Sequence, residues 1–352
     1  MFVPLARSSL LVLFGSVWSA SAAPGLSLKL SGAQKVSGVS NLKVTATVTN
    51  TGDDILKLLN DPRGPLSKFP TETFEIAHQD TGASPTFTGV KVKYVPEVAI
   101  RIGKDDAFTV LAPGESISVE HDLSEAYDFA TSGEGTYTVA GARSFSFIDP
   151  SSGTPANLIA KDVQPHVLAI SGELTVPRPT QTKRETYTGC GVNEQSTITA
   201  AAAAAQSYAA ASFNYLQTHT ASTPRFTTWF GKFSAADRTT VLTHFTNLNN
   251  NSYASYSFDC TCTDSGVYAY VRPDVFGKVT VCGAFWQAPV TGTDSQGGTL
   301  IHESTHFIQN AGTQDYVYGQ TDAMGLAQSN PTEAINNADN HEYFAENNPV
   351  LS

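Results

Sequence analysis

The chain has 352 residues, of which 41% are hydrophobic and 15% are charged, and its formal net charge is −11. A chain this acidic is a poor match for nucleic acids or anionic membrane surfaces, and we expect neither as a partner. Cationic substrates are favoured instead.

Residues 1–22 are predicted to be a secretory signal peptide. Arg7 precedes an apolar run from residue 10 to residue 18, and the small residues at 20–22 form a cleavage site. The apolar run is too short to span a bilayer, and no other stretch approaches the length of a membrane span. We therefore expect a soluble, secreted protein.

Residues 23–185 are predicted to form an all-β, sandwich-like region. Short strand-like segments at 42–48, 108–111, 117–119 and 135–139 are separated by turns rich in Gly, Pro and Asp. The region has no cysteine and no cluster of metal ligands. Its scattered histidines are interpreted as ordinary surface residues; they are His78, His121 and His166.

The segment 176–185 is polar and proline-rich, which indicates an exposed linker. It contains the dibasic pair Lys183-Arg184, a processing site for a precursor, and lies where the composition of the chain changes. We therefore interpret residues 23–185 as a propeptide and a binding partner of the remaining chain.

Residues 186–352 are predicted to be an α+β, mainly helical domain. An alanine-rich helix is expected within 194–216 and an amphipathic helix at 235–248. Strands at 256–262, 267–271 and 278–282 are expected to form a small antiparallel sheet. Asn330-Pro331 supplies an N-cap and a first-turn proline for the last helix.

All the cysteines fall in this domain, at Cys190, Cys260, Cys262 and Cys282. An even number of cysteines in a secreted chain predicts disulfides. Cys260 and Cys262 lie two apart on one face of a strand and should not bond to each other. The paired CxxC motifs of a structural zinc site are absent.

The pentapeptide His302-Glu303-Ser304-Thr305-His306 carries the clearest chemical signal. Histidines at i and i+4 share one helix face, so both imidazoles can reach one metal ion. Glu303 can face a water beside that metal, as in zinc metallopeptidases. Residues 293–295 offer N-caps, and Gly312 is expected to end the helix. A buried stripe is expected beside the ligands; its members are Leu300, Ile301, Thr305 and Ile308.

A catalytic zinc needs a third protein ligand and an open fourth position. A chain that turns back at Gly312 can bring Asp315 beneath the two histidines. Glu333 or Glu342, on a later helix, are alternative third ligands. The metzincin pattern is excluded, because Gln309 and Gly312 occupy the positions where it requires glycine and histidine.

HExxH followed by GTxDxxYG (312–319) resembles the aspzincins, the deuterolysin family of fungal zinc metallopeptidases. Four further runs are similar to the peptidyl-Lys metalloendopeptidases of mushrooms, and the resemblance covers essentially all of 186–352. These runs are TYTGC (186–190), CGAFW (282–286), GTDSQGGTL (292–300) and NADNHEYFAENNP (337–349).

The resemblance implies a zincin-like domain with one Zn²⁺ held by His302, His306 and Asp315. It also implies that Tyr318 donates a hydrogen bond to the oxyanion, while Glu303 acts as general base. The implied disulfides are Cys190–Cys260 and Cys262–Cys282. Phe285 and Trp286 are expected either to line the cleft or to form a buried aromatic pair.

The resemblance further places Asp339 and Glu342 at a pocket for the substrate lysine ammonium. Their i, i+3 spacing puts both carboxylates on one helix face, although a solvated acidic face would give the same pattern. Residues 186–352 contain only two lysines, Lys232 and Lys278, as expected for an enzyme that avoids cutting itself.

The predicted activity is hydrolysis of protein or peptide substrates on the amino side of lysine by a monomeric zinc endopeptidase. One alternative is a deuterolysin of broader specificity. Another is a catalytically silent, secreted metal-binding effector, which the retained Glu303 disfavours. Asn250-Asn251-Ser252 is a glycosylation sequon.

Overall fold

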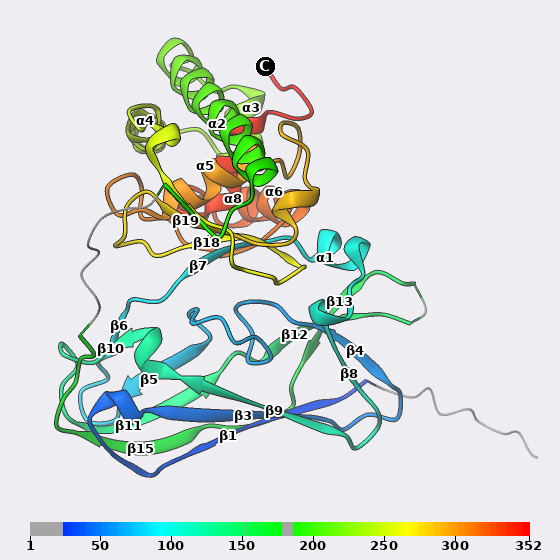
Figure 1. Ribbon diagram of the computed structural model, residues 1–352, viewed down its shortest axis with the longest axis vertical. Coiled ribbons are helices and arrows are strands. Elements are labelled where there is room, and N and C mark those ends of the chain that lie inside the picture. The colour runs from blue at the N-terminus through cyan, green and yellow to red at the C-terminus, as the bar shows by residue number, and fades with distance from the viewer. Residues whose placement is uncertain (1–23, 151, 178–185) are drawn as a thin grey trace, which may run out of the picture.

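The computed structural model of the chain describes residues 24–150, 152–177 and 186–352. The predicted signal peptide and the Lys183-Arg184 pair lie outside the described residues. The fold is mixed α and β. In Figure 1 most strands of the N-terminal region lie at the bottom and the C-terminal helices at the top.

The N-terminal region consists mainly of short strands. Its strands are β1 (Leu26–Gly32), β2 (Lys35–Ser37), β3 (Lys43–Asn50), β4 (Leu56–Leu59), β5 (Phe74–His78), β6 (Thr86–Phe87), β7 (Lys91–Tyr94), β8 (Phe108–Leu111), β9 (Ser116–Asp122), β10 (Tyr127–Asp128), β11 (Gly135–Gly141), β12 (Ser144–Ile148), β13 (Pro155–Ile159), β14 (Asp162–Gln164) and β15 (His166–Ser171). Helix α1 (Pro96–Ile102) follows β7. The strands predicted from the sequence correspond to β3, β8, β9 and β11.

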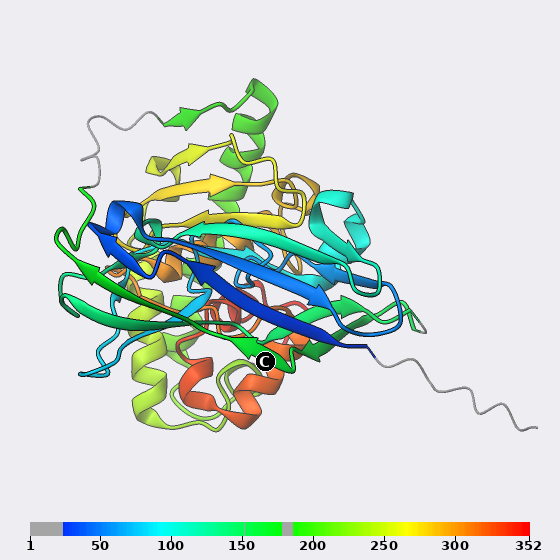
Figure 2. The same ribbon diagram turned by 90° about the horizontal axis from the view of Figure 1, so that it is seen from below.

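Three four-stranded sheets and one strand pair organise the described part of this region. Their orders are β14-β1-β3-β9, β2-β15-β11-β5, β13-β12-β4-β8 and β10-β6. Side chains alternate across each strand, so every second residue can face the interior. Leu28 of β1 and Val48 of β3 share a core with Tyr137 of β11 and Ile170 of β15. The first two sheets therefore bury apolar residues together, and Figure 2 shows the blue and green strands of this region from below.

The interpretation of the three N-terminal histidines as surface residues was wrong. His78, His121 and His166 are all buried. Each ring bonds a backbone carbonyl: His78 that of Glu134 at 3.1 Å, His121 that of Pro65 at 3.1 Å and His166 that of Ala33 at 3.0 Å. A neutral imidazole with a satisfied nitrogen can be buried at little cost, and the sequence does not reveal such a partner.

The C-terminal region holds most of the helices. They are α2 (Val192–Thr218), α3 (Pro224–Phe230), α4 (Ala235–Asn249), α5 (Gln296–His306), α6 (Gln320–Ser329), α7 (Pro331–Ala334) and α8 (Ala338–Glu346). Its strands are β16 (Tyr187–Thr188), β17 (Ser257–Asp259), β18 (Val267–Val271) and β19 (Lys278–Val281). Both long helices occur where propensity and periodicity predicted them. Asn330 caps a helix as expected, but α7 is short and α8 begins anew after it.

Helix α5, which carries the HExxH pentapeptide, packs between α2 and α8. Alanine favours the helix α2 and also presents small side chains to its neighbour. A Cβ on Gly297 of α5 would lie 2.7 Å from the Cβ of Ala204, which is too close for any larger residue. The alanine run of α2 and the glycines of α5 thus allow the two helices to approach closely.

The C-terminal sheet is mixed, which corrects the predicted antiparallel sheet. Its order is β16-β17-β19-β18-β7. β19 forms an antiparallel pair with β18 and inserts between β18 and β17, so it runs parallel to β17. The edge strand beside β18 is β7, which comes from the N-terminal region and pairs antiparallel with β18. Figure 1 shows β7 beneath β18 and β19.

The disulfides are those that the resemblance implied. Cys190 pairs with Cys260 and Cys262 with Cys282, with Cα–Cα distances of 5.0 and 4.8 Å. The first ties the segment before α2 to the end of β17, and the second ties the segment before β18 to the end of β19.

None of the helices within the described residues is long and apolar enough to cross a membrane.

Candidate active site

Helix α5 presents the HExxH motif inside the C-terminal core. Ser295 is its N-cap, and the Ser295 side chain accepts a hydrogen bond from the backbone N–H of Gly298. The helix ends at His306, six residues before the predicted end at Gly312. Ile308, expected in the buried stripe, is 70% exposed, because it lies beyond the helix. The other stripe residues are fully buried: Leu300, Ile301 and Thr305.

The segment after α5 turns back beneath the helix, as the sequence predicted. Gly312 has φ of +63°, a conformation that suits glycine. The Thr313 hydroxyl lies 2.6 Å from that of Thr305 in α5. Asn337 then accepts a hydrogen bond from the Tyr316 N–H at 2.8 Å. These contacts fix the segment that carries Asp315.

His302, His306 and Asp315 converge on one point. Oδ1 of Asp315 lies 3.2 Å from Nε2 of His302 and 3.2 Å from Nε2 of His306. All three atoms are buried and have no hydrogen-bond partner. Tetrahedral zinc with ligand bonds near 2.0–2.1 Å would space its ligand atoms by about 3.3 Å. The three residues therefore fit a zinc ion.

The outer nitrogens of both histidines also face oxygen atoms. Nδ1 of His306 donates to the Thr313 carbonyl at 2.9 Å, and Nδ1 of His302 lies 2.8 Å from a carboxylate oxygen of Asp339. A proton held on Nδ1 leaves Nε2 free to bind a metal.

The alternative third ligands are less well placed. Glu342 faces Nδ1 of His302 at 3.3 Å, on the side of the ring away from Asp315. Among the described residues, Glu333 belongs to no group of potential metal ligands. Asp315 fits the position best.

Glu303 lies beside this cluster and is shielded from solvent. It is fully buried, and burial raises the pKa of its carboxyl to about 8. Its Oε1 accepts a hydrogen bond from the backbone N–H of Lys93 at 3.0 Å. Glu303 can therefore exchange a proton with a group at the position of that nitrogen.

Tyr318 contacts the carbonyl end of the same peptide bond, which joins Val92 to Lys93. Its hydroxyl donates to the carbonyl oxygen of Val92 at 2.8 Å. Burial raises the pKa of Tyr318 well above its usual value, which keeps the hydroxyl protonated as a donor. Tyr316, the less favoured tyrosine, is 42% exposed and has no such contact with β7.

Asp339 and Glu342 of α8 form a closed acidic pocket rather than a solvated face. Both are fully buried, and the side chain of Lys93 enters between them. The Lys93 ammonium lies 2.7 Å from Oε2 of Glu342 and 3.2 Å from Oδ1 of Asp339. Burial alone would lower the pKa of Lys93, but the carboxylates outweigh it and hold the pKa well above its usual value.

Sequence reasoning missed a third carboxylate in this pocket. Oδ1 of Asp294 lies 3.4 Å from the Lys93 ammonium and accepts a 2.6 Å hydrogen bond from the Tyr343 hydroxyl. Asp294 was considered only as a helix cap. Its position in the sequence, eight residues before His302, gives no sign that it faces α8.

Phe285 and Trp286 form an aromatic pair with ring centroids 5.2 Å apart. Phe285 is fully buried and belongs to the C-terminal core, against which the half-buried Trp286 also packs. The pair is structural in character, which was one of the two expectations.

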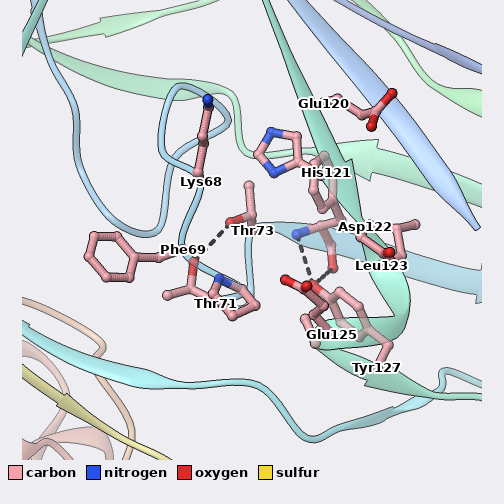
Figure 3. Close-up of a pocket in the computed structure, with 13 residues that line it drawn as sticks. Lys68, Phe69, Thr71, Thr73, Glu120, His121, Asp122, Leu123, Glu125 and Tyr127 are labelled. Carbon is pink, nitrogen blue, oxygen red and sulfur yellow. Dashed lines mark hydrogen bonds between the residues drawn. The ribbon is translucent and has the colours of Figure 1, made fainter. Parts of the chain in front are cut away.

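A separate cavity of about 210 Å³ lies within the N-terminal region (Figure 3). It lies between the loop of residues 68–74 and the segment around His121. Two of its polar groups already have partners: His121 bonds the Pro65 carbonyl, and Asp122 accepts a hydrogen bond from Ser124. We assign no chemistry to it.

Comparison with known proteins identifies the family of this chain. The aspzincin family model, described as lysine-specific metallo-endopeptidase, matches residues 215–346. The peptidyl-Lys metalloendopeptidase of Grifola frondosa is 57% identical over 334 residues, covering 94% of this chain and 95% of the relative. That of Armillaria mellea is 54% identical over 354 residues and covers both chains completely. That of Pleurotus ostreatus is 60% identical over 167 residues, 47% of this chain and 99% of the relative. The chain therefore belongs to the aspzincin family of metalloendopeptidases.

Proposed function

We propose that this chain is the secreted precursor of a zinc endopeptidase that hydrolyses peptide bonds on the amino side of lysine. The observation that carries the proposal is a lysine side chain, Lys93, seated in an acidic pocket beside the HExxH cluster. The backbone amide of that lysine lies against Glu303. The relatives named peptidyl-Lys metalloendopeptidases support the same specificity.

His302, His306 and Asp315 are the proposed ligands of one zinc ion per catalytic domain. When bound, zinc supplies Lewis-acid chemistry, because it acidifies water and polarises a carbonyl group. The groups that orient the two histidines belong to this chain. Asp339 orients His302, and the Thr313 carbonyl orients His306.

Glu303 is the proposed general base and acid. It takes a proton from the attacking water and delivers it to the leaving amine, whose position the Lys93 nitrogen marks. Tyr318 donates to the carbonyl oxygen as negative charge develops there. Exclusion of water from this buried site strengthens both interactions.

The acidic pocket is proposed to select lysine after the scissile bond. Asp339 and Glu342 are fully buried, so an ammonium is needed to compensate their charge. The slim lysine stem reaches between them, whereas the planar fork of arginine needs a wider pocket. Asp294 adds a third acidic contact.

We assign residues 1–22 to a signal peptide, 23–185 to a sandwich-like propeptide and 186–352 to the zinc peptidase domain. The 167-residue match to the Pleurotus ostreatus relative, which equals the length of 186–352, supports the last boundary. The disulfides fit an oxidising, extracellular location.

Mass mapping tests this function most directly. A defined, denatured protein is incubated with the processed enzyme, and the fragments are sequenced. New N-termini should be lysines, and a chelator should stop their appearance. Cleavage spread over many residue types would instead indicate a deuterolysin of broad specificity, and no chelator-sensitive cleavage would indicate a silent metal-binding protein.

A further inference from the structure

The outer edge of β18 is covered by a strand from the other region of the chain. β7 pairs antiparallel with β18, with Lys93 opposite Ala269 and Tyr94 opposite Val267. Without β7, this edge would present unpaired backbone groups, which an extended peptide can satisfy by adding a strand. The edge of β18 is therefore a binding surface for extended chains.

The Val92–Lys93 peptide bond lies among the proposed catalytic groups. Tyr318 donates to its carbonyl oxygen at 2.8 Å, and its amide nitrogen donates to Glu303 at 3.0 Å. The Val92 N–H also donates to Oδ2 of Asp315 at 3.2 Å. Both ends of the bond thus meet groups that would act on a substrate.

The side chain of Lys93 occupies the place of the specificity residue. It is fully buried, and its ammonium contacts carboxylates only from the C-terminal region. Lys91, two residues earlier, behaves differently. Its ammonium lies 3.1 Å from Glu72 of the N-terminal region and 2.5 Å from Gln314, outside the acidic pocket.

We propose that residues 91–94 are a built-in substrate mimic, with Lys93 as the residue that keeps the precursor latent by filling the lysine pocket. This inference rests on the proposed function and adds the means of its regulation. The occupant of the cleft is a segment of the same chain, bound in the direction and register of a substrate.

Contacts on both sides of Val92–Lys93 hold the strand in place. On one side, Arg63 donates to the carbonyl of Asp315 at 2.9 Å, and its guanidinium lies 4.1 Å from the Tyr318 ring centre. On the other side, Val95 and Val98 pack against Tyr268 of β18. A tethered segment competes at a high effective concentration, so free peptides are excluded even where each contact is modest.

A cavity of about 600 Å³ remains between the two regions, beside His306 and Asp315. Arg63 and Lys91 line it from the N-terminal side. The mimic therefore fills the lysine pocket and the scissile-bond position. It leaves space next to the proposed zinc ligands His306 and Asp315.

The test uses the full chain carrying Glu303→Gln, which prevents turnover while keeping an acceptor oxygen at that position. Lys93→Met is added in one variant and Lys91→Met in its matched control. Fluorescence anisotropy measures binding of a labelled peptide with one internal lysine, and of the same peptide with leucine there. Thermal unfolding checks that each variant is folded, and Lys93→Ala repeats the experiment with a shorter side chain.

The lysine peptide should bind the Lys93→Met chain at least about tenfold more tightly than the Lys91→Met chain or the parent, because the competing ammonium is gone. The leucine peptide should show no such gain. Equal binding by folded Lys93 and Lys91 variants would overturn the inference. If the processed enzyme still cuts before lysine in that case, the proposed function survives; if it does not cut there, the function fails separately.

Discussion

A carboxylate oxygen of Asp339 lies 2.8 Å from Nδ1 of His302, while Nε2 of the same ring faces Asp315. The same carboxylate lies 3.2 Å from the Lys93 ammonium. Glu342 shows the opposite balance, at 2.7 Å from the ammonium and 3.3 Å from the ring nitrogen. The two residues look equivalent in the sequence, yet Asp339 lies closer to the His302 ring and Glu342 lies closer to the Lys93 ammonium.

This difference predicts distinct effects of two substitutions. Glu342→Gln should lower kcat/KM for Xaa-Lys bonds by roughly 10- to 150-fold, because a charge-assisted contact is typically worth about 1.5–3 kcal/mol. Its zinc affinity should change little. Asp339→Asn should lower the same kcat/KM and also weaken zinc binding by about tenfold, as loss of a partner to a ligating histidine does.

The measurement is kcat/KM on matched peptides that differ only after the cleavage point, together with a competitive zinc titration. The double variant should lose its lysine preference when zinc is saturating. Retention of that preference would show that the ammonium binds elsewhere.

The HExxH residues are expected to separate catalysis from metal binding. Glu303→Gln should keep zinc stoichiometric and remove most activity, since it deletes the base and leaves the ligands. His306→Ala and Asp315→Ala should lose zinc itself, because each removes one of three ligands. Zinc content by atomic absorption and hydrolysis of a lysine peptide distinguish these outcomes. Full zinc affinity in Asp315→Ala would return Glu333 and Glu342 to consideration.

Maturation is expected to produce an enzyme that begins within a few residues of Thr186. The Lys183-Arg184 pair allows two routes: cleavage before Lys183 by the enzyme itself, or cleavage after Arg184 by a dibasic-directed protease. N-terminal sequencing of secreted wild-type and Glu303→Gln chains separates them. A Glu303→Gln chain that stays intact indicates self-processing, and one that is cut normally indicates a second protease.

Much of the site followed from local sequence pattern. The spacing of His302 and His306 determines their common helix face, and a glycine turn brings Asp315 back beneath them. These features depend on residues close together in the chain, where backbone geometry limits the possibilities. The same holds for the helices α2 and α4, whose propensity and periodicity were clear.

What escaped prediction depends on contacts between distant parts of the chain. Lys93 lies in a short strand with ordinary composition, and only its pairing with β18 brings it into the acidic pocket. The mixed sheet was missed for a related reason, because strand spacing does not reveal that β19 inserts between β17 and β18. Helix α5 ends early at Phe307, whose backbone is not helical and whose side chain is fully buried; no local signal in the sequence marks this end.

A buried histidine pair behind the site predicts how the protein responds to acid. Nδ1 of His244 in α4 lies 3.0 Å from Nε2 of His341 in α8, and Nδ1 of His341 lies 3.0 Å from the Asn337 carbonyl. His341 therefore donates to that carbonyl and accepts from His244, and both rings are neutral. Burial lowers the pKa of His244 to about 4 and that of His341 to about 3.

Because the folded pKa values lie below the unfolded value of about 6.5, the unfolded chain binds more protons as the pH falls. The stabilisation is complete above about pH 6.5 and is lost progressively toward pH 4. Lowering the pH from 7 to 5 should therefore reduce the free energy of unfolding by about 2 kcal/mol for each of the two histidines. His244→Gln keeps a donor for His341 but removes one titrating group. The decrease in its free energy of unfolding between pH 7 and pH 5 should therefore be about 2 kcal/mol smaller than that of the parent. Urea unfolding at both pH values, in the Glu303→Gln background, provides the comparison. The control replaces the exposed His219 by Gln, and its free energy of unfolding should decrease as much as that of the parent. If His244→Gln also shows the full decrease, acid acts elsewhere in the fold.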